Sequence, residues 1–233
     1  MLIAASLMKG EIMNSARKRV VVFISGGGSN MVSLAEACAA PDFPAEIVAV
    51  ISDKPTAGGL AKAGARGIKT YVFERKAYAG KAEHEAAILA ALAEINPDII
   101  CLAGYMRLIS GDFIRPYEGR ILNIHPSLLP LFPGLHTHQR ALDAGMKIAG
   151  CSVHFVTEGM DEGPIVAQAA VPIASADTAD TLAGRVLTVE HKLYPLALKL
   201  FAEGKVRMDG GRSVSAQAAA PAIFPQIISP IEI

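Results

Sequence analysis

The feature that most constrains this chain is an alternation of short apolar runs with helix-like segments over its first 125 residues. The runs are rich in β-branched residues and carry few charges, which is typical of strands buried on both faces of a parallel sheet. They lie at 20–24, 47–52, 69–73, 98–103 and 120–124, and the helix-like segments lie at 31–39, 58–67, 81–95 and 110–117. This alternation predicts right-handed βαβ units. We therefore expect an α/β fold with an open, mostly parallel twisted sheet and helices on both faces.

The pattern changes after residue 125. Residues 126–133 contain three prolines and little periodicity, which predicts a long loop of the kind that often carries function. Strands at 150–157 and 165–173 follow, and then a helix for which Asp177 is the expected N-cap. We expect an N-terminal extension at 1–17, a single domain at 18–208 and a C-terminal tail at 209–233.

Charge and cysteine content narrow the class of partner. The chain carries 22 Lys+Arg against 22 Asp+Glu, so it lacks the excess positive charge that nucleic-acid binding needs, and a small-molecule partner is expected. Its apolar runs are shorter than the ~20 residues that span a bilayer, which predicts no membrane segment. The three cysteines form no C-x-x-C pair, which favours a reducing compartment, the cytoplasm. The neutral charge leaves both a monomer and a homodimer open.

A glycine-rich turn, SGGGSN at 25–30, separates the first strand from the first helix. Glycines let the backbone approach an anion closely, and N–H groups at a helix N-terminus attract phosphate. We therefore expect a phosphate site. The dinucleotide motif G-x-G-x-x-G fails because position 31 is Met, and no Gly-Lys-Ser/Thr makes a P-loop. A plain tight turn remains an alternative, as does an NAD-dependent oxidoreductase with Asp53 as the ribose ligand.

A second candidate site lies at the end of the strand at 120–124. Asn123 and His125 face the same side because side chains alternate along a strand. An amide can donate to a developing oxyanion, and an imidazole can gain or lose a proton near neutral pH. Asp161, in a loop after a later strand, would favour the protonated imidazole if it lay beside His125. A histidine bonded to a backbone carbonyl is the alternative, and the sequence by itself does not pair Asp161 with His125.

Three further histidines raise the question of a metal site. His136, His138 and His154 could join Asp161 in a ligand set, but zinc sites usually show clearer ligand pairs. We expect no metal, and histidines that hydrogen-bond within the loop and the strand. Arg107 and Glu190 taken alone are typical of solvated or paired charges.

Three segments together resemble one enzyme family. They are ISGGGSN at 24–30, LAGYMRLIS at 102–110 continuing to NIHPSLLPLFPGLHTHQRAL at 123–142, and SVHFVTEGMDEGPIVAQ at 152–168. NIHPSLLP with the downstream GLHTH is highly specific, whereas the glycine-rich turn is not. On these motifs, residues 18–208 resemble the phosphoribosylglycinamide formyltransferases. The resemblance implies a formyltransferase fold with a Rossmann-like N-terminal half.

The resemblance also implies a reaction. The formyl group of the co-substrate 10-formyltetrahydrofolate would pass to the amine of glycinamide ribonucleotide, a step of de novo purine biosynthesis. The positions that match the family's catalytic set are Asn123, His125 and Asp161. Asn123 and His125 would hold the oxyanion of a tetrahedral intermediate. Asp161 would keep His125 protonated and help to move the amine proton through water.

Binding residues follow from the same match. The phosphate and glycinamide positions are Gly28, Ser29, Asn30 and Glu190. The folate positions are Lys81, Met106, Arg107, Leu108, Ile109, Asn123, Thr157, Glu158, Gly159, Met160 and Asp161. Two positions depart from the family pattern. Lys81 stands where an Arg is expected, so the bidentate fork is lost, and Leu187 stands where a polar nucleotide contact is common.

Other readings compete with this one. Methionyl-tRNA formyltransferase would need a further C-terminal domain, and formyltetrahydrofolate hydrolase usually carries an extra N-terminal regulatory domain. The oxidoreductase alternative leaves Asn123, His125 and Asp161 without a role. A non-enzymatic nucleotide-binding module predicts that replacing His125 has no effect.

Overall fold

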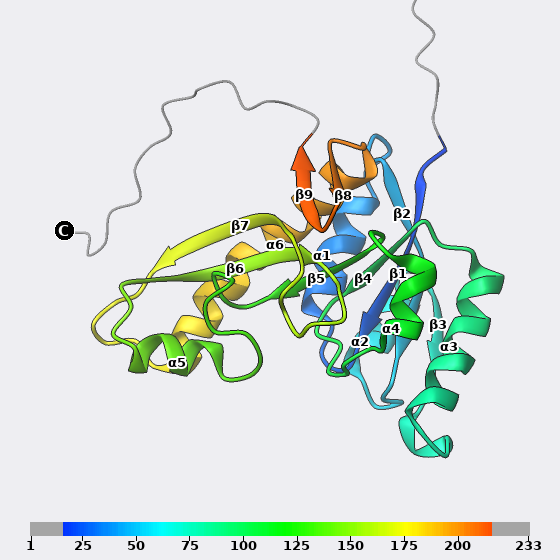
Figure 1. Ribbon diagram of the computed structural model, residues 1–233, viewed down its shortest axis with the longest axis horizontal. Helices are drawn as coiled ribbons and strands as arrows, with labels where there is room; N and C mark the ends of the chain where they lie inside the picture. Colours follow the sequence, from blue (N-terminus) through cyan, green and yellow to red (C-terminus); the bar gives the residue numbers. More distant parts are fainter. Residues whose placement is uncertain (1–15, 216–233) are drawn as a thin grey trace, which may run out of the picture.

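A mixed sheet of seven strands forms the centre of the molecule in the computed structural model, which describes residues 16–215 (Figure 1). The strands are β1 (Lys18–Ile24), β2 (Ala45–Ser52), β3 (Lys69–Val72), β4 (Ile99–Leu102), β5 (Ile121–His125), β6 (Ile148–Phe155) and β7 (Ile165–Pro172). Their order is β3-β2-β1-β4-β5-β6-β7. The first five strands are parallel to one another, whereas β6 is antiparallel to both β5 and β7. The predicted open, mostly parallel sheet is therefore confirmed.

Helices cover both faces of this sheet, also as predicted (Figure 1). They are α1 (Ser29–Cys38), α2 (Gly58–Gly64), α3 (Lys81–Ile95), α4 (Gly111–Ile114), α5 (Thr137–Asp143) and α6 (Ala179–Ala202), with 3-10 turns at Arg75–Ala77 and Arg115–Tyr117. Val20, Val22 and Ile24 of β1 belong to the core shared with α1 and α6. Val21 and Phe23 belong to the core shared with α3 and α4. Central strands buried on both faces explain why these runs are continuously apolar rather than alternating.

The strand order reverses direction between β1 and β4. From β1 the chain first builds outward through β2 and β3, then returns to the other side of β1 with β4 and β5. Such a switch point leaves a crevice at the carboxyl ends of the two strands, where open α/β sheets bind ligands. The segments leaving β1 and β4 are joined there, because the Ser25 N–H donates to the Gly104 carbonyl at 3.1 Å.

Three local features differ from the sequence expectations. The N-cap of α6 is Thr178, whose side chain accepts from Thr181 N–H, because both carboxylate oxygens of Asp177 are bonded to Arg185. Helix α5 follows the predicted loop at 126–133, in a stretch for which the sequence analysis names no element. A hairpin of β8 (Val206–Asp209) and β9 (Arg212–Ser215) lies across the predicted boundary between domain and tail.

The predicted domain limits stay predictions. Most of the expected N-terminal extension and most of the expected tail lie outside residues 16–215. Within that range no helix combines the length and the apolar character needed to cross a bilayer.

Candidate active site

The antiparallel pairing of β5 and β6 builds the first half of the site. Asn123 lies opposite His154, and His125 lies opposite Ser152. The amide nitrogen of Asn123 lies 3.1 Å from Nε2 of His154. The Ser152 hydroxyl donates to the Ser127 carbonyl at 2.7 Å and so secures the loop that follows His125. The sheet register therefore fixes both predicted residues at the carboxyl end of β5.

Asp161 completes the cluster from the loop after β6. Its carboxylate oxygen Oδ2 lies 3.3 Å from Nδ1 of His125 and accepts from Gly134 N–H at 2.8 Å. Asp161 adopts a left-handed backbone conformation, with φ of 57°. The tight loop thus turns the carboxylate back onto the strand. The structure brings together Asn123, His125 and Asp161, which the sequence could name only separately.

Both ring nitrogens of His125 face oxygen acceptors. Nε2 lies 3.0 Å from the carbonyl oxygen of Phe132, while Nδ1 faces Asp161. Only the imidazolium form carries a proton on each nitrogen and can donate to both acceptors at once. The ring is also buried, so its orientation is fixed by these two contacts. The arrangement places a proton donor beside the amide of Asn123.

His154 supports the amide of Asn123, a role that the sequence did not indicate: it predicted a histidine hydrogen-bonded within the strand but did not identify its partner. Its Nδ1 lies 2.8 Å from the Phe155 carbonyl and acts as the donor, which leaves Nε2 as an acceptor for the Asn123 amide. Burial lowers the pKa of His154 from its ordinary value of 6.5 and keeps the ring neutral. One amide hydrogen of Asn123 is thereby engaged, and the second remains for another acceptor. The alternation of Ser152 and His154 on one face of β6 was the available signal.

A metal-binding arrangement is not assembled from these histidines. His136 is exposed at the start of α5, and Nε2 of His154 lies 3.8 Å from Asp161. In residues 16–215, no three or more His, Cys, Asp or Glu side chains are grouped as metal ligands would be.

The glycine-rich turn leads directly into α1. Gly28 is the N-cap, with φ of 69°, and a Cβ at this position would lie 2.7 Å from the Cα of Gly59. Only glycine meets both conditions without strain. The next two residues begin the helix, and Asn30 donates through Nδ2 to Glu190 of α6 at 2.7 Å. Burial raises the pKa of Glu190. Among the described residues 16–215, the buried Oδ1 of Asn30 has no hydrogen-bond partner. The predicted nucleotide residues therefore form one connected group.

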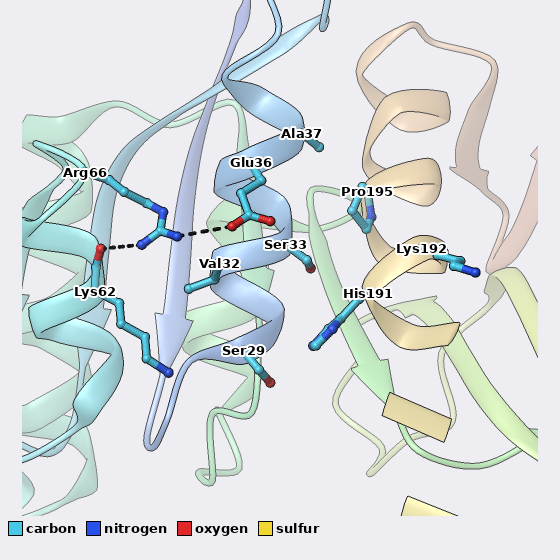
Figure 2. Close-up of a pocket in the computed structure, with 10 residues that line it drawn as sticks. All are labelled: Ser29, Val32, Ser33, Glu36, Ala37, Lys62, Arg66, His191, Lys192 and Pro195. Carbon is cyan, nitrogen blue, oxygen red and sulfur yellow. Dashed lines mark hydrogen bonds and ion pairs between the residues drawn. The ribbon is translucent and has the colours of Figure 1, made fainter. Parts of the chain in front are cut away.

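A groove of about 590 Å³ opens beside this turn, between α1, α2 and α6 (Figure 2). Ser29 lines it, as do the basic side chains of Lys62 from α2 and Arg66 from the turn that follows α2. The Lys62 ammonium donates to the Gly27 carbonyl at 2.8 Å, whereas Arg66 is paired with Glu36. Lys62 thus brings positive charge to the turn, a contribution that the sequence did not reveal because α2 packs there through tertiary contacts.

The predicted folate segment, residues 106–109, leaves apolar side chains in solvent. Met106 is 65% exposed and Leu108 is 63% exposed. The predicted opposite wall, residues 157–161, comes close at Gly111, because a Cβ on Gly111 would collide with the Glu158 carboxylate. Met160 is also half exposed. Exposed apolar side chains of this kind are common in sites for flat organic ligands.

Asp53 takes part in holding this segment. It is 2% exposed, accepts from the Arg107 Nε–H at 2.8 Å and accepts from the Ser25 hydroxyl at 2.6 Å. Ser25 in turn accepts from Met106 N–H. Both oxygens of Asp53 are engaged inside the protein, which leaves the oxidoreductase alternative without its ribose ligand.

Lys81 lies at the start of α3, with its ammonium 3.8 Å from Glu85.

Comparison with known proteins gives consistent matches. The formyl transferase family matches residues 18–198. The trifunctional purine biosynthetic protein adenosine-3 of Bos taurus is 48% identical over 197 residues, 84% of this chain and 20% of that protein. The phosphoribosylglycinamide formyltransferase of Escherichia coli (strain K12) is 42% identical over 189 residues, 81% of this chain and 89% of that protein. The crystal structure of phosphoribosylglycinamide formyltransferase from Brucella melitensis has a TM-score of 0.78 and 71% identity, covering 86% of this chain and 100% of that chain. The chain therefore spans a fifth or less of the length of the trifunctional relatives that it matches.

Proposed function

The chain belongs to the formyl transferase family, and we propose that it transfers the formyl group of 10-formyltetrahydrofolate to the amine of glycinamide ribonucleotide. The products are formylglycinamide ribonucleotide and tetrahydrofolate, and the reaction serves purine biosynthesis. The observation that carries the proposal is the convergence of the Asn123 amide, the His125 imidazole and the Asp161 carboxylate at the carboxyl end of β5. A carboxylate, an imidazole and an amide suffice for acyl transfer without a covalent enzyme intermediate.

Each of the three residues has a distinct role in the proposed step. The amine nitrogen attacks the formyl carbon, and the carbonyl oxygen becomes an oxyanion that the free N–H of Asn123 stabilises. His125 donates a second hydrogen bond to this oxygen, and Asp161 stabilises the imidazolium. The bond from the formyl carbon to the folate nitrogen then breaks. The amine proton passes to that nitrogen through a water ordered by Asp161.

The position of Phe132 adds a requirement. Its carbonyl accepts from Nε2 of His125, so this N–H must leave the Phe132 carbonyl, or be shared with it, before it can reach the oxyanion. Within residues 16–215, no protein acceptor competes for the second amide hydrogen of Asn123. We therefore assign the amide as the donor that is already in place and His125 as the donor that substrate binding must recruit.

The nucleotide is expected at the turn that begins α1. Its phosphate would meet the N–H groups of Gly28, Ser29 and Asn30 together with the ammonium of Lys62. Its glycinamide end would lie near Glu190, which is fixed by Asn30. Leu187 is 36% exposed on α6, and its apolar side chain offers no polar contact to the nucleotide.

The folate is expected between two segments that meet at Gly111 and Glu158. Residues 106–109 would supply backbone groups and apolar contacts on one side, and residues 157–161 would supply them on the other. Lys81 would contribute a single positive charge near this pocket.

The mechanism invokes no metal. The cytoplasm as location, and a monomer or a homodimer as the assembly, stay predictions.

A spectrophotometric assay tests the proposal. Purified protein is mixed with 10-formyltetrahydrofolate, and the absorbance change of deformylation is followed with and without glycinamide ribonucleotide. Deformylation that requires the nucleotide supports transfer. Deformylation without the nucleotide would indicate a hydrolase, and no reaction in either mixture would favour a binding module.

A further inference from the structure

The folate segment 106–109 has no regular secondary structure to hold its shape. It connects the end of β4 to α4, and two of its apolar side chains, Met106 and Leu108, lie largely in solvent. Irregular backbone is held in place only where its polar groups find partners. The polar contacts at the two ends of the segment therefore decide where its side chains and backbone groups stand.

The first end is held to the glycine-rich turn. Met106 N–H donates to the Ser25 hydroxyl at 2.9 Å, and Arg107 donates to Asp53. These contacts also involve Ser25, the first residue of the glycine-rich turn. A substitution at this end would therefore disturb the proposed nucleotide and folate positions together.

The second end is held by one carboxylate, that of Glu85 on α3. Glu85 is 7% exposed, its Oε1 accepts from Ser110 N–H at 3.0 Å, and its Oε2 accepts from the Ser110 hydroxyl. The Ser110 side chain also caps α4 by accepting from Phe113 N–H at 3.3 Å. A buried carboxylate needs partners of this kind to offset its lost hydration. The contacts join α3, the end of the folate segment and the start of α4.

We propose that Glu85 is a positioning residue for the folate co-substrate, which sets residues 106–109 by holding Ser110. The inference rests on the proposed function. Glu85 lies apart from the groups assigned to the chemistry, which come from β5 and the loop after β6. It is also on the other face of the sheet from α1 and α6, which carry the nucleotide residues. Loss of Glu85 should therefore weaken folate binding selectively.

Steady-state kinetics of two variants test this. For Glu85→Ala we expect the KM for 10-formyltetrahydrofolate to rise about tenfold, while kcat and the KM for glycinamide ribonucleotide change less than about twofold. Glu85→Gln keeps an oxygen for Ser110 N–H but places an NH2 donor where Oε2 accepts from the Ser110 hydroxyl, so it should restore part of the loss. Glu94→Ala is the matched control, because it removes an exposed carboxylate from the same helix and should leave all three constants unchanged.

The outcomes separate this inference from the proposed function. An inactive wild-type protein would overturn the proposed function and this inference with it. An active wild type, with a folate KM unchanged in both Glu85 variants, would overturn only the positioning role. A similar rise in the KM values of both substrates would also overturn the positioning role. If Glu85→Ala does not fold, Glu85→Gln carries the test through the same ratio of the two KM values.

Discussion

Nδ1 of His125 lies 3.3 Å from Oδ2 of Asp161, although one residue ends a strand and the other belongs to a loop beyond the neighbouring strand. The contact exists because β6 returns antiparallel to β5 and the left-handed conformation of Asp161 turns its carboxylate inward. The pair is thus a product of tertiary structure. Its chemistry also depends on residues that hold the surrounding groups, and these can be tested one at a time.

His154 should make the fold sensitive to acid. Burial lowers its pKa in the folded protein below the ordinary value of 6.5, so the unfolded chain binds the proton more readily. Stability from this group is complete above about pH 6.5 and is lost as the pH falls below that value. His154→Gln removes the titration. We expect its urea midpoint to fall less than that of the wild type between pH 7.5 and pH 5.5, and an equal fall would contradict this assignment.

The same substitution should slow catalysis. His154→Gln replaces the ring nitrogen that accepts from the Asn123 amide, so the amide loses its fixed orientation. We expect kcat to fall about tenfold, with both KM values changed less than about twofold, because the amide acts mainly on the oxyanion. A kcat equal to that of the wild type would show that Asn123 needs no such support.

Glu190 should lower the stability of the fold while it contributes to nucleotide binding. Burial raises its pKa above the ordinary value of 4.5, so ionisation costs stability as the pH rises through the raised pKa. Glu190→Gln avoids this cost and still accepts from Asn30. At pH 7.5 we expect Tm to rise by about 2–4 °C, the equivalent of ~1 kcal/mol at this chain length. The gain should shrink towards pH 4.5, and the KM for the nucleotide should rise. A lower Tm at pH 7.5 would contradict the account.

Lys62 should contribute to nucleotide affinity through its charge. Its ammonium lies at the carbonyl of Gly27, beside the proposed phosphate position. We expect Lys62→Ala to raise the KM for glycinamide ribonucleotide about tenfold and to weaken its dependence on salt, since a screened charge has been removed. Lys62→Arg should restore most of the affinity. Arg66→Ala removes the same charge from the same groove but is paired with Glu36, so it serves as the control.

Gly28 should tolerate no side chain. Alanine there combines a φ of 69° with a Cβ 2.7 Å from Gly59, which should cost on the order of 1–3 kcal/mol or more of unfolding free energy. Gly26→Ala has open space and should stay within about 0.5 kcal/mol of the wild type. Urea unfolding of the two variants checks the difference. Equal stabilities would mean that the turn is not constrained as described.

Local sequence signals predicted much of the fold. The alanine-rich pattern at 81–95 corresponds to α3 with the same limits, and the apolar run at 20–24 lies within β1. Helix periodicity and continuous apolar runs can both be read from residues that are close together in the sequence, so these elements could be predicted. The N-cap of α6 was placed one residue early at Asp177, because the competing partner, Arg185, lies two turns further along the helix.

The site was less accessible to sequence reasoning. Asn123 and His125 could be placed on one side of a strand from alternation alone. The contacts of these two residues could not be predicted, because the register of β5 with β6 joins residues distant in sequence. The same holds for the approach of α2 to the glycine-rich turn. For that reason His154, Lys62 and Glu85 acquired roles only from the structure. The resemblance to a known family named the catalytic set but did not supply these supporting contacts.

Turnover of His125→Ala and Asp161→Ala, with formyl transfer measured at saturating substrates and folding checked by thermal unfolding, tests the central claim most directly. We expect each folded variant to lose at least ~100-fold in kcat, the lower end for a residue that transfers protons. Near-normal turnover in both folded variants would contradict the assignment of these residues to the chemistry.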